Sequence, residues 1–159
     1  MAFYMIFMNG GREEGELDNS GYLFDTDVLI AFLRGKNARL KKQMNDLLRR
    51  DIPVYMSIIS LGELYLGAFK SDNTPKNMAL VNSLKERLDL LELTEDTVML
   101  YGEIEAVLEK SGQMIGDFDV LIASTAIRND VTLVSGNERH FNRIVTLFGQ
   151  LQFESWDIN

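Results

Sequence analysis

The sequence contains no cysteine, which excludes disulfide bonds, thiolate metal sites and cysteine nucleophiles. It has a single histidine, His140, which argues against a zinc site and excludes a two-histidine ribonuclease mechanism within one chain. No GxSxG segment is present to support a serine triad, and beside Phe141 we expect His140 to have a packing role at the surface. Absence of cysteine is typical of a reducing compartment, so we expect a cytoplasmic protein.

Long apolar runs are also missing. The opening MAFYMIFM has no basic flank before it and leads into an acidic stretch without a small-residue cleavage site, so we expect neither a signal peptide nor a membrane span. The formal net charge of −8, from 16 basic and 24 acidic residues, argues against unaided binding to a polyanion.

The few basic residues are unevenly distributed. Seven of the 16 fall between Arg34 and Arg50, where Asp46 is the one acid. This segment is either a phosphate-binding face or an ordinary solvated helix surface, and the charge pattern alone leaves both open.

Apolar periodicity and Gly/Pro punctuation predict short strands that alternate with helices. Strands are expected at 21–25, 54–56, 90–93, 132–135 and 152–156, and helices at 26–33, 38–50, 58–69, 75–90, 95–112, 118–129 and 137–144. Such alternation favours a layered α/β fold with a mostly parallel sheet. A chain of 159 residues, 46% of them hydrophobic, suits one domain.

Residues 1–20 differ from the rest of the chain. An apolar octet followed by NGGREEGELDNS has the look of an added segment: an extra strand, a partner-binding arm, or an artefact of the assumed translation start. We therefore expect an N-terminal extension over 1–20 and a single domain over 21–159.

Several acids lie where a core residue is expected. Asp25 directly follows the first strand, at the sheet edge where ligands of parallel α/β folds bind. Asp119 shares the apolar stripe of its helix with Ile122 and Ala126, while Asp117 is the natural N-cap and is expected to be structural.

Glu63 also shares a face with apolar residues of its helix. A capping box with Ser60 would explain it, but Ser57 is better placed as the helix cap. Three inward acids from three elements, with no basic residue near them in sequence, fit a hard divalent cation such as Mg²⁺ or Mn²⁺ better than a salt bridge.

At these positions the chain resembles the PIN-domain nucleases, in particular toxins of the VapC type. The resemblance covers 21–156 and rests on the order and spacing of several blocks: DTDVLI after a strand, SxxxxxEL with Glu63, IGDFDVLIASTAI with Asp119, TLVSGNERHF with Asn137, and a terminal ESW.

The resemblance implies a three-layer α/β/α sandwich with a central, mostly parallel sheet, usually as a homodimer. It implies an endoribonuclease that cuts single-stranded or loop RNA with Mg²⁺ or Mn²⁺, leaves 5′-phosphate and 3′-hydroxyl ends, and is inhibited by a small antitoxin encoded with it.

Site residues follow from the same resemblance. Asp25, Glu63 and Asp119 match the three core acidic ligands, and Thr26 and Ser57 match hydroxyls beside them. Where many members have a fourth acid, this chain offers Ser135, Asn137 and Glu138. Asp27 is expected to support Asp25 or to stabilise the helix dipole. If the basic segment faces RNA, the contacts are expected from Arg34, Lys36, Arg39, Lys41 and Lys42.

Two alternatives remain. LFDTDVL also resembles the nucleophile strand of haloacid-dehalogenase-type phosphatases, but the stretch before GDFD is a poor strand and DVLIASTAI reads as helix. The other alternative is a PIN-like interaction module whose acids bind only structural metal or hydrogen-bond donors.

Overall fold

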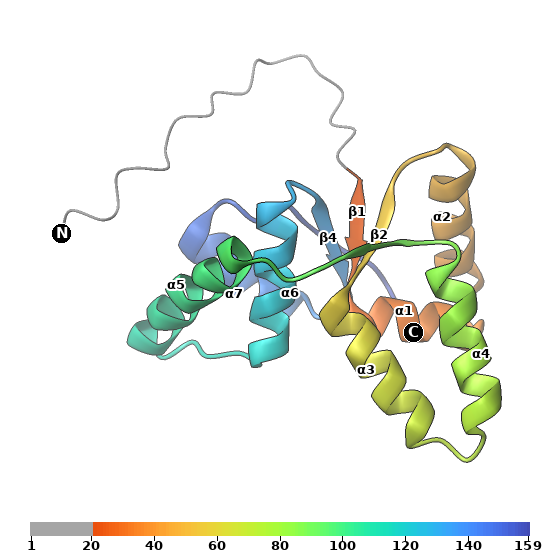
Figure 1. The fold of residues 1–159 in the computed structure, drawn as a ribbon. Helices are drawn as coiled ribbons and strands as arrows, with labels where there is room; N and C mark the ends of the chain where they lie inside the picture. Colours follow the sequence, from red (N-terminus) through yellow and green to blue (C-terminus); the bar gives the residue numbers. More distant parts are fainter. Residues whose placement is uncertain (1–20) are drawn as a thin grey trace.

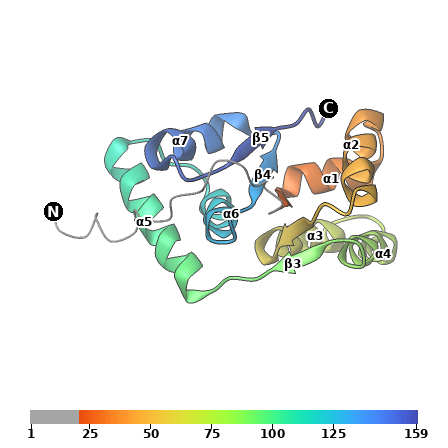
Figure 2. The same cartoon turned by 90° about the horizontal axis from the view of Figure 1, so that it is seen from above.

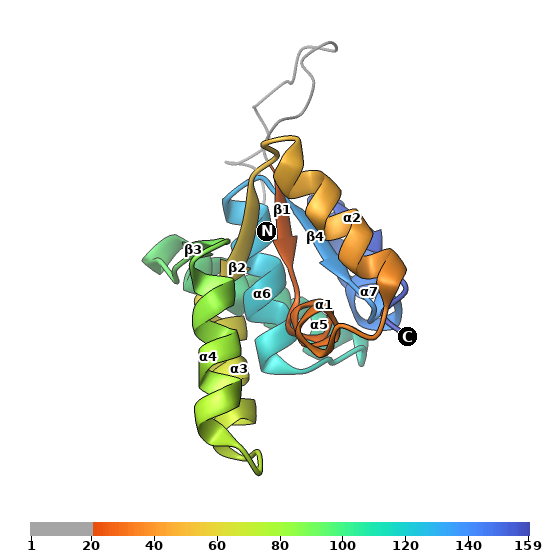
Figure 3. The ribbon, with the colours of Figure 1, turned by 90° about the vertical axis from the view of Figure 1, so that its right-hand side faces the viewer.

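A computed structural model describes residues 21–159, and the predicted extension over 1–20 lies outside the described residues. Its centre is a parallel sheet of five strands in the order β3-β2-β1-β4-β5. Figure 1 shows β2, β1 and β4 side by side, and Figure 3 also shows β3 beyond β2. The strands are β1 (Tyr22–Phe24), β2 (Val54–Ser57), β3 (Asp89–Leu91), β4 (Thr132–Ser135) and β5 (Phe153–Ser155).

Helices cover both faces of this sheet, as Figure 2 shows from above. One face carries α1 (Thr26–Arg34), α2 (Ala38–Arg49), α3 (Ile58–Phe69) and α4 (Thr74–Lys85), and the other carries α5 (Glu95–Ser111), α6 (Asp117–Arg128) and α7 (Glu138–Phe148). The predicted three-layer sandwich is therefore confirmed, and its sheet is entirely parallel.

Each face of the sheet has its own hydrophobic core, and successive side chains of the central strands pack into opposite cores. Leu23 packs against α5, α6 and α7, whereas Phe24 packs against the helices of the other face; Leu133 and Val134 divide in the same way. Because both faces are covered, the central strands are mostly apolar and lack the polar alternation of a half-exposed sheet.

The strand order creates a switch point at the carboxyl ends of β1 and β4. From β1 the chain adds β2 and then β3 on one side, and later adds β4 and then β5 on the other side. The connection that follows β1 and the connection that follows β4 run over opposite faces of the sheet. Folds of this kind bind ligands at such a switch point.

Two predicted helix ends need correction. The helix predicted to reach residue 90 ends at Lys85, because β3 begins at Asp89 and pairs with β2. The last helix continues to Phe148, beyond the predicted 144, and ends where Gly149 adopts a left-handed conformation (φ 60°). None of the helices within residues 21–159 is long and apolar enough to cross a membrane.

Candidate active site

Asp25 is placed by the end of β1 and the start of α1. Its backbone N–H donates to the Val134 carbonyl on β4 at 2.9 Å, and its own carbonyl accepts the first bond of α1 from Leu29. The side chain caps the helix, with Oδ1 2.7 Å from the Thr26 N–H. Asp25 is therefore fixed at the switch point and is 5% exposed.

The turn after β4 is tied to both aspartates of the DTD segment. The Ser135 hydroxyl lies 2.7 Å from Asp25 Oδ2, and Asp27 Oδ2 accepts from the Gly136 N–H at 3.0 Å. A Cβ added at Gly136 would meet the Ile158 side chain at 2.7 Å and Asp27 Oδ2 at 3.0 Å, so a larger residue would have to displace Ile158. Asp27 thus holds the turn that carries Ser135 through contacts with Ser135 and Gly136.

Negative charge is concentrated here. Burial, followed by the charges of Asp27 and Asp119, raises the pKa of Asp25 to about 7, against the lowering effect of hydrogen bonds from Ser135 and Thr26. Burial is also the main cause that raises the pKa of Asp27, with a contribution from Asp119. Clustered carboxylates of this kind are typical of functional sites and favour the approach of a cation.

Glu63 reaches the same region through hydroxyl groups. Its Oε2 accepts a short hydrogen bond from the Thr26 hydroxyl, which also lies 3.0 Å from Ser60 Oγ. Ser57 caps α3 by accepting from the Ser60 N–H at 2.9 Å. Ser57 is the cap that the sequence predicts, and Glu63 contacts the start of α1 instead of forming a capping box.

Asp119 lies in the first turn of α6 and faces α7. Its Oδ2 lies 2.6 Å from His140 Nδ1, and the Asn137 side chain lies 2.8 Å from the same nitrogen. The predicted packing role of His140 was wrong, because its ring is hydrogen-bonded to the Asp119 carboxylate. This hydrogen bond depends on how α6 and α7 pack against each other, which the sequence of either helix alone does not show. The one available signal was the spacing of Asn137 and His140, three residues apart on a helix.

Asp117 is not the helix cap that its position suggests. The cap residue of α6 is Gly116, with no side-chain cap bond, and Asp117 is the first helical residue, exposed to solvent. An acid in the first turn still interacts favourably with the helix dipole. Glu138 is likewise the first residue of its helix, α7, and is exposed to solvent. It accepts a hydrogen bond from the Asn142 side chain at 3.3 Å.

The donor chemistry of this edge fits a hard divalent cation, although the side chains do not form a closed cage. Asp25, Asp119 and Glu63 offer oxygen only. Burial and the neighbouring acids raise the pKa of Asp25, and a cation bound there would favour its charged form. Within residues 21–159, no group of three or more carboxylate or imidazole side chains is gathered closely enough to hold a metal ion.

A groove of about 570 Å³ runs from this site between α1, α3 and α4. Apolar residues Ile30, Leu33 and Leu80 line it together with Glu63 and Arg34. The five basic residues predicted to contact RNA are exposed at the end of α1, in the linker to α2 and on α2 itself: Arg34, Lys36, Arg39, Lys41 and Lys42.

Comparison with known proteins agrees with this arrangement. Residues 22–147 match the model of the PIN domain, and the chain belongs to that family. It is 32% identical to ribonuclease VapC2 of Rickettsia felis, across 86% of this chain and 98% of that protein. It is 29% identical to the tRNA(fMet)-specific endonuclease VapC of Shigella flexneri, across 85% of this chain and 97% of that protein.

Solved structures show the same fold. The VapBC2 complex of Rickettsia felis bound to a promoter DNA fragment contains a chain with a TM-score of 0.78 and 29% identity, covering 86% of this chain and 98% of that one. VapBC-1 from nontypeable Haemophilus influenzae gives a TM-score of 0.74 and 30% identity, covering 85% and 97%. The phosphatase alternative loses its support, because GDFD begins a helix and β4, which ends at Ser135, is followed by Gly136 and Asn137, with no pair of acids.

Proposed function

We propose that this chain is a metal-dependent endoribonuclease and the toxin of a toxin-antitoxin pair, acting in the cytoplasm through one nuclease domain over 21–159. The observation that carries the proposal is the buried Asp25 at the switch point, with the acids of α3 and α6 directed to the same edge. Membership of the PIN domain family and relatives named as ribonucleases support it.

Asp25, Asp119 and Glu63 would hold Mg²⁺ or Mn²⁺. When bound, the ion would acidify an attacking water and offset charge at the phosphate during phosphodiester hydrolysis. The chain contributes the fixed position of Asp25, set by Ser135 and Thr26, and the orientation of Glu63, set by the Thr26 hydroxyl.

RNA is the proposed substrate. Because the chain has a net charge of −8, it needs a local basic surface to approach a polyanion. Arg34 lines the same groove as Glu63, so phosphate contacts at that end lie near the site. Since two relatives are named tRNA(fMet)-specific endonucleases, that tRNA is the first substrate to test.

The proposed inhibitor is a cognate antitoxin. Similar chains occur in VapBC structures, and the groove between α1, α3 and α4 is the surface we assign to the antitoxin. A segment that places apolar side chains against Leu33 and Leu80 would reach Glu63, so binding there also covers the acidic site.

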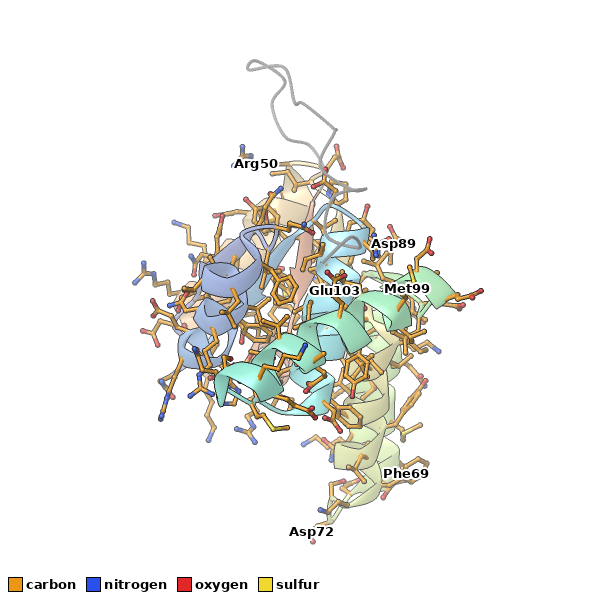
Figure 4. The ribbon with its side chains drawn as sticks, turned by 90° about the vertical axis from the view of Figure 1, so that its left-hand side faces the viewer. Arg50, Phe69, Asp72, Asp89, Met99 and Glu103 are labelled. Carbon is orange, nitrogen blue, oxygen red and sulfur yellow. The ribbon has the colours of Figure 1, made fainter. Side chains whose placement is uncertain are left out.

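Homodimerisation is proposed through exposed apolar side chains of α3 and α5. Leu66, Phe69, Val98 and Met99 are 44–67% exposed, and Figure 4 shows Phe69 and Met99 on their helices. Large apolar side chains gathered on a surface are typical of an interface. Light scattering of Met99→Glu against wild type tests this assignment: the variant is expected to be monomeric and the wild type dimeric.

The function is tested by incubating purified protein with the tRNA and Mn²⁺ or Mg²⁺, with and without EDTA. Wild type is expected to cleave only with metal, and Asp25→Asn or Glu63→Gln to lose about 10²-fold or more in rate. Glu103→Gln, an exposed acid on α5, is the matched control and is expected to cleave like wild type. A folded wild type that binds metal but cleaves no RNA would indicate an interaction module instead.

A further inference from the structure

One face of α7 holds the N-terminal end of α6 in place. Asn137, His140 and Arg143 follow at intervals of three residues. His140 and Arg143 contact α6 and the segment that leads into it, and Asn137 contacts His140. Arg143 donates to the backbone carbonyls of Met114 at 2.8 Å and Gln113 at 3.2 Å, in the segment that leads into α6. The chain segment that leads to Asp119 is therefore held in place by α7.

The contact between His140 and Asp119 is the closest of these. Nδ1 lies 2.6 Å from Asp119 Oδ2, a distance typical of a hydrogen bond to a charged group. Nδ1 has either one hydrogen or one lone pair. Beside a carboxylate it carries the hydrogen and donates to Asp119. The structure places the Asn137 amide nitrogen 2.8 Å from the same Nδ1, and a half-turn of this amide, which exchanges its nitrogen and oxygen, would let the oxygen share that hydrogen.

Asn137 is used in an unusual way for its position. It occupies the N-cap of α7, where an asparagine side chain normally accepts a backbone N–H, yet it makes no cap bond and lies against His140 instead. Helix stability given up at a cap indicates that the side chain is required elsewhere. The His140 ring that Asn137 contacts is itself hydrogen-bonded to Asp119.

We propose that His140, supported by Asn137, is a positioning residue that orients Asp119 for metal binding. Donation from Nδ1 occupies Oδ2 and fixes the plane of the carboxylate. Oδ1 has no hydrogen-bond partner within residues 21–159 and is left for the ion. The inference rests on the proposed function, since it concerns a residue acting on a proposed metal ligand.

Two amide substitutions of His140 distinguish the role of Nδ1 from that of Nε2. In His140→Asn the side-chain amide nitrogen takes the place of Nδ1 and can still donate to Asp119, whereas in His140→Gln it takes the place of Nε2. Positioning through Nδ1 predicts that Asn retains function, and that Gln behaves like Ala.

Activity and metal affinity are measured for each variant. His140→Ala and His140→Gln are expected to lower kcat on the tRNA about 10- to 100-fold with little change in KM, and to weaken Mn²⁺ binding, followed by the EPR signal of free Mn²⁺, by a similar factor. His140→Asn is expected to stay within a few-fold of wild type. Asn142→Ala, exposed on the same helix, is the control.

A double variant tests whether the effect passes through Asp119. Asp119→Asn combined with His140→Ala is expected to be no slower than Asp119→Asn alone, because the two residues act as one unit. Wild-type kcat and Mn²⁺ affinity in His140→Ala, or rescue by Gln instead of Asn, would overturn the inference. If wild type cleaves no RNA, the proposed function fails, and the Mn²⁺ titration alone then decides the role of His140.

Discussion

Ser135 at the end of β4 donates its hydroxyl hydrogen to Asp25 at the end of β1, over an Oγ to Oδ2 distance of 2.7 Å. This bond joins the two strands that flank the switch point of the sheet. It also lowers the pKa of Asp25, against burial and the neighbouring acids that raise it. A buried carboxylate held in this way is positioned to bind a cation. Without a cation, its buried charge lowers the stability of the folded protein.

Asp25 is expected to make the stability of the metal-free protein depend on pH. Its pKa is about 7 in the folded chain and close to 3.8 in the unfolded chain. Between these values the folded state retains a proton that the unfolded state has lost, so the free energy of unfolding falls as pH rises from about 4 to 7. A shift of this size corresponds to a loss of at most about 4 kcal/mol.

Asp25→Asn removes this titration. Urea unfolding in EDTA should show a variant that is more stable than wild type at pH 8 and similar to it at pH 4. Asp72→Asn, an exposed acid in the loop between α3 and α4, provides the control and should follow the wild-type curve. Equal stability of Asp25→Asn and wild type at pH 8 would show that the carboxylate is not destabilising.

Ser135→Ala is expected to raise the pKa of Asp25 further, because it removes a bond that favours the charged form. It also leaves the Asn137 N–H, which donates to Ser135 Oγ at 2.9 Å, without its acceptor. We expect a loss of about 1–3 kcal/mol in stability and an activity profile displaced to higher pH. Ser155→Ala on the neighbouring β5 is exposed and should change neither.

Thr26→Val retains the shape of the side chain and removes its hydroxyl, so Glu63 loses a donor. Cleavage should slow by about 10- to 100-fold, as for other residues that orient a metal ligand. Thr26→Ser keeps the hydroxyl and should remain close to wild type in the same single-turnover assay. Equal rates for the valine and serine variants would exclude a role for this hydroxyl.

Gly67→Leu is expected to separate catalysis from inhibition. A Cβ added at Gly67 meets nothing within 4 Å, so a larger side chain can enter the groove without disturbing the fold. RNA cleavage should persist while the cognate antitoxin no longer suppresses it. Asn82→Leu adds an apolar side chain on α4 outside the groove-lining set, and its inhibition should match wild type.

The sequence predicts the fold well because its local signals agree. Gly35 ends α1 in a left-handed conformation (φ 65°), and Ser57 caps α3, as their positions indicate. The order of the strands is not a local property, since it depends on which edge each crossover reaches. Asp25 is recognisable as a site residue because it directly follows a buried strand.

Other site features depend on packing. The contact of His140 with Asp119 joins residues 21 positions apart on two helices, and nothing in either helix alone specifies that they face each other. The sequence suggests only a capping box for Ser60, yet its hydroxyl links Ser57 to Thr26 through contacts of 3.0 Å. Asp117 carries a strong local capping signal, but the helix begins one residue earlier than that signal implies.

The most direct test of the central claim is to map the RNA ends that wild type and Asp119→Asn produce in Mn²⁺. The account predicts 5′-phosphate and 3′-hydroxyl ends from wild type, and a rate at least about 10²-fold lower from a folded Asp119→Asn. Ends with 2′,3′-cyclic phosphate, or equal cleavage by the two proteins, would contradict it.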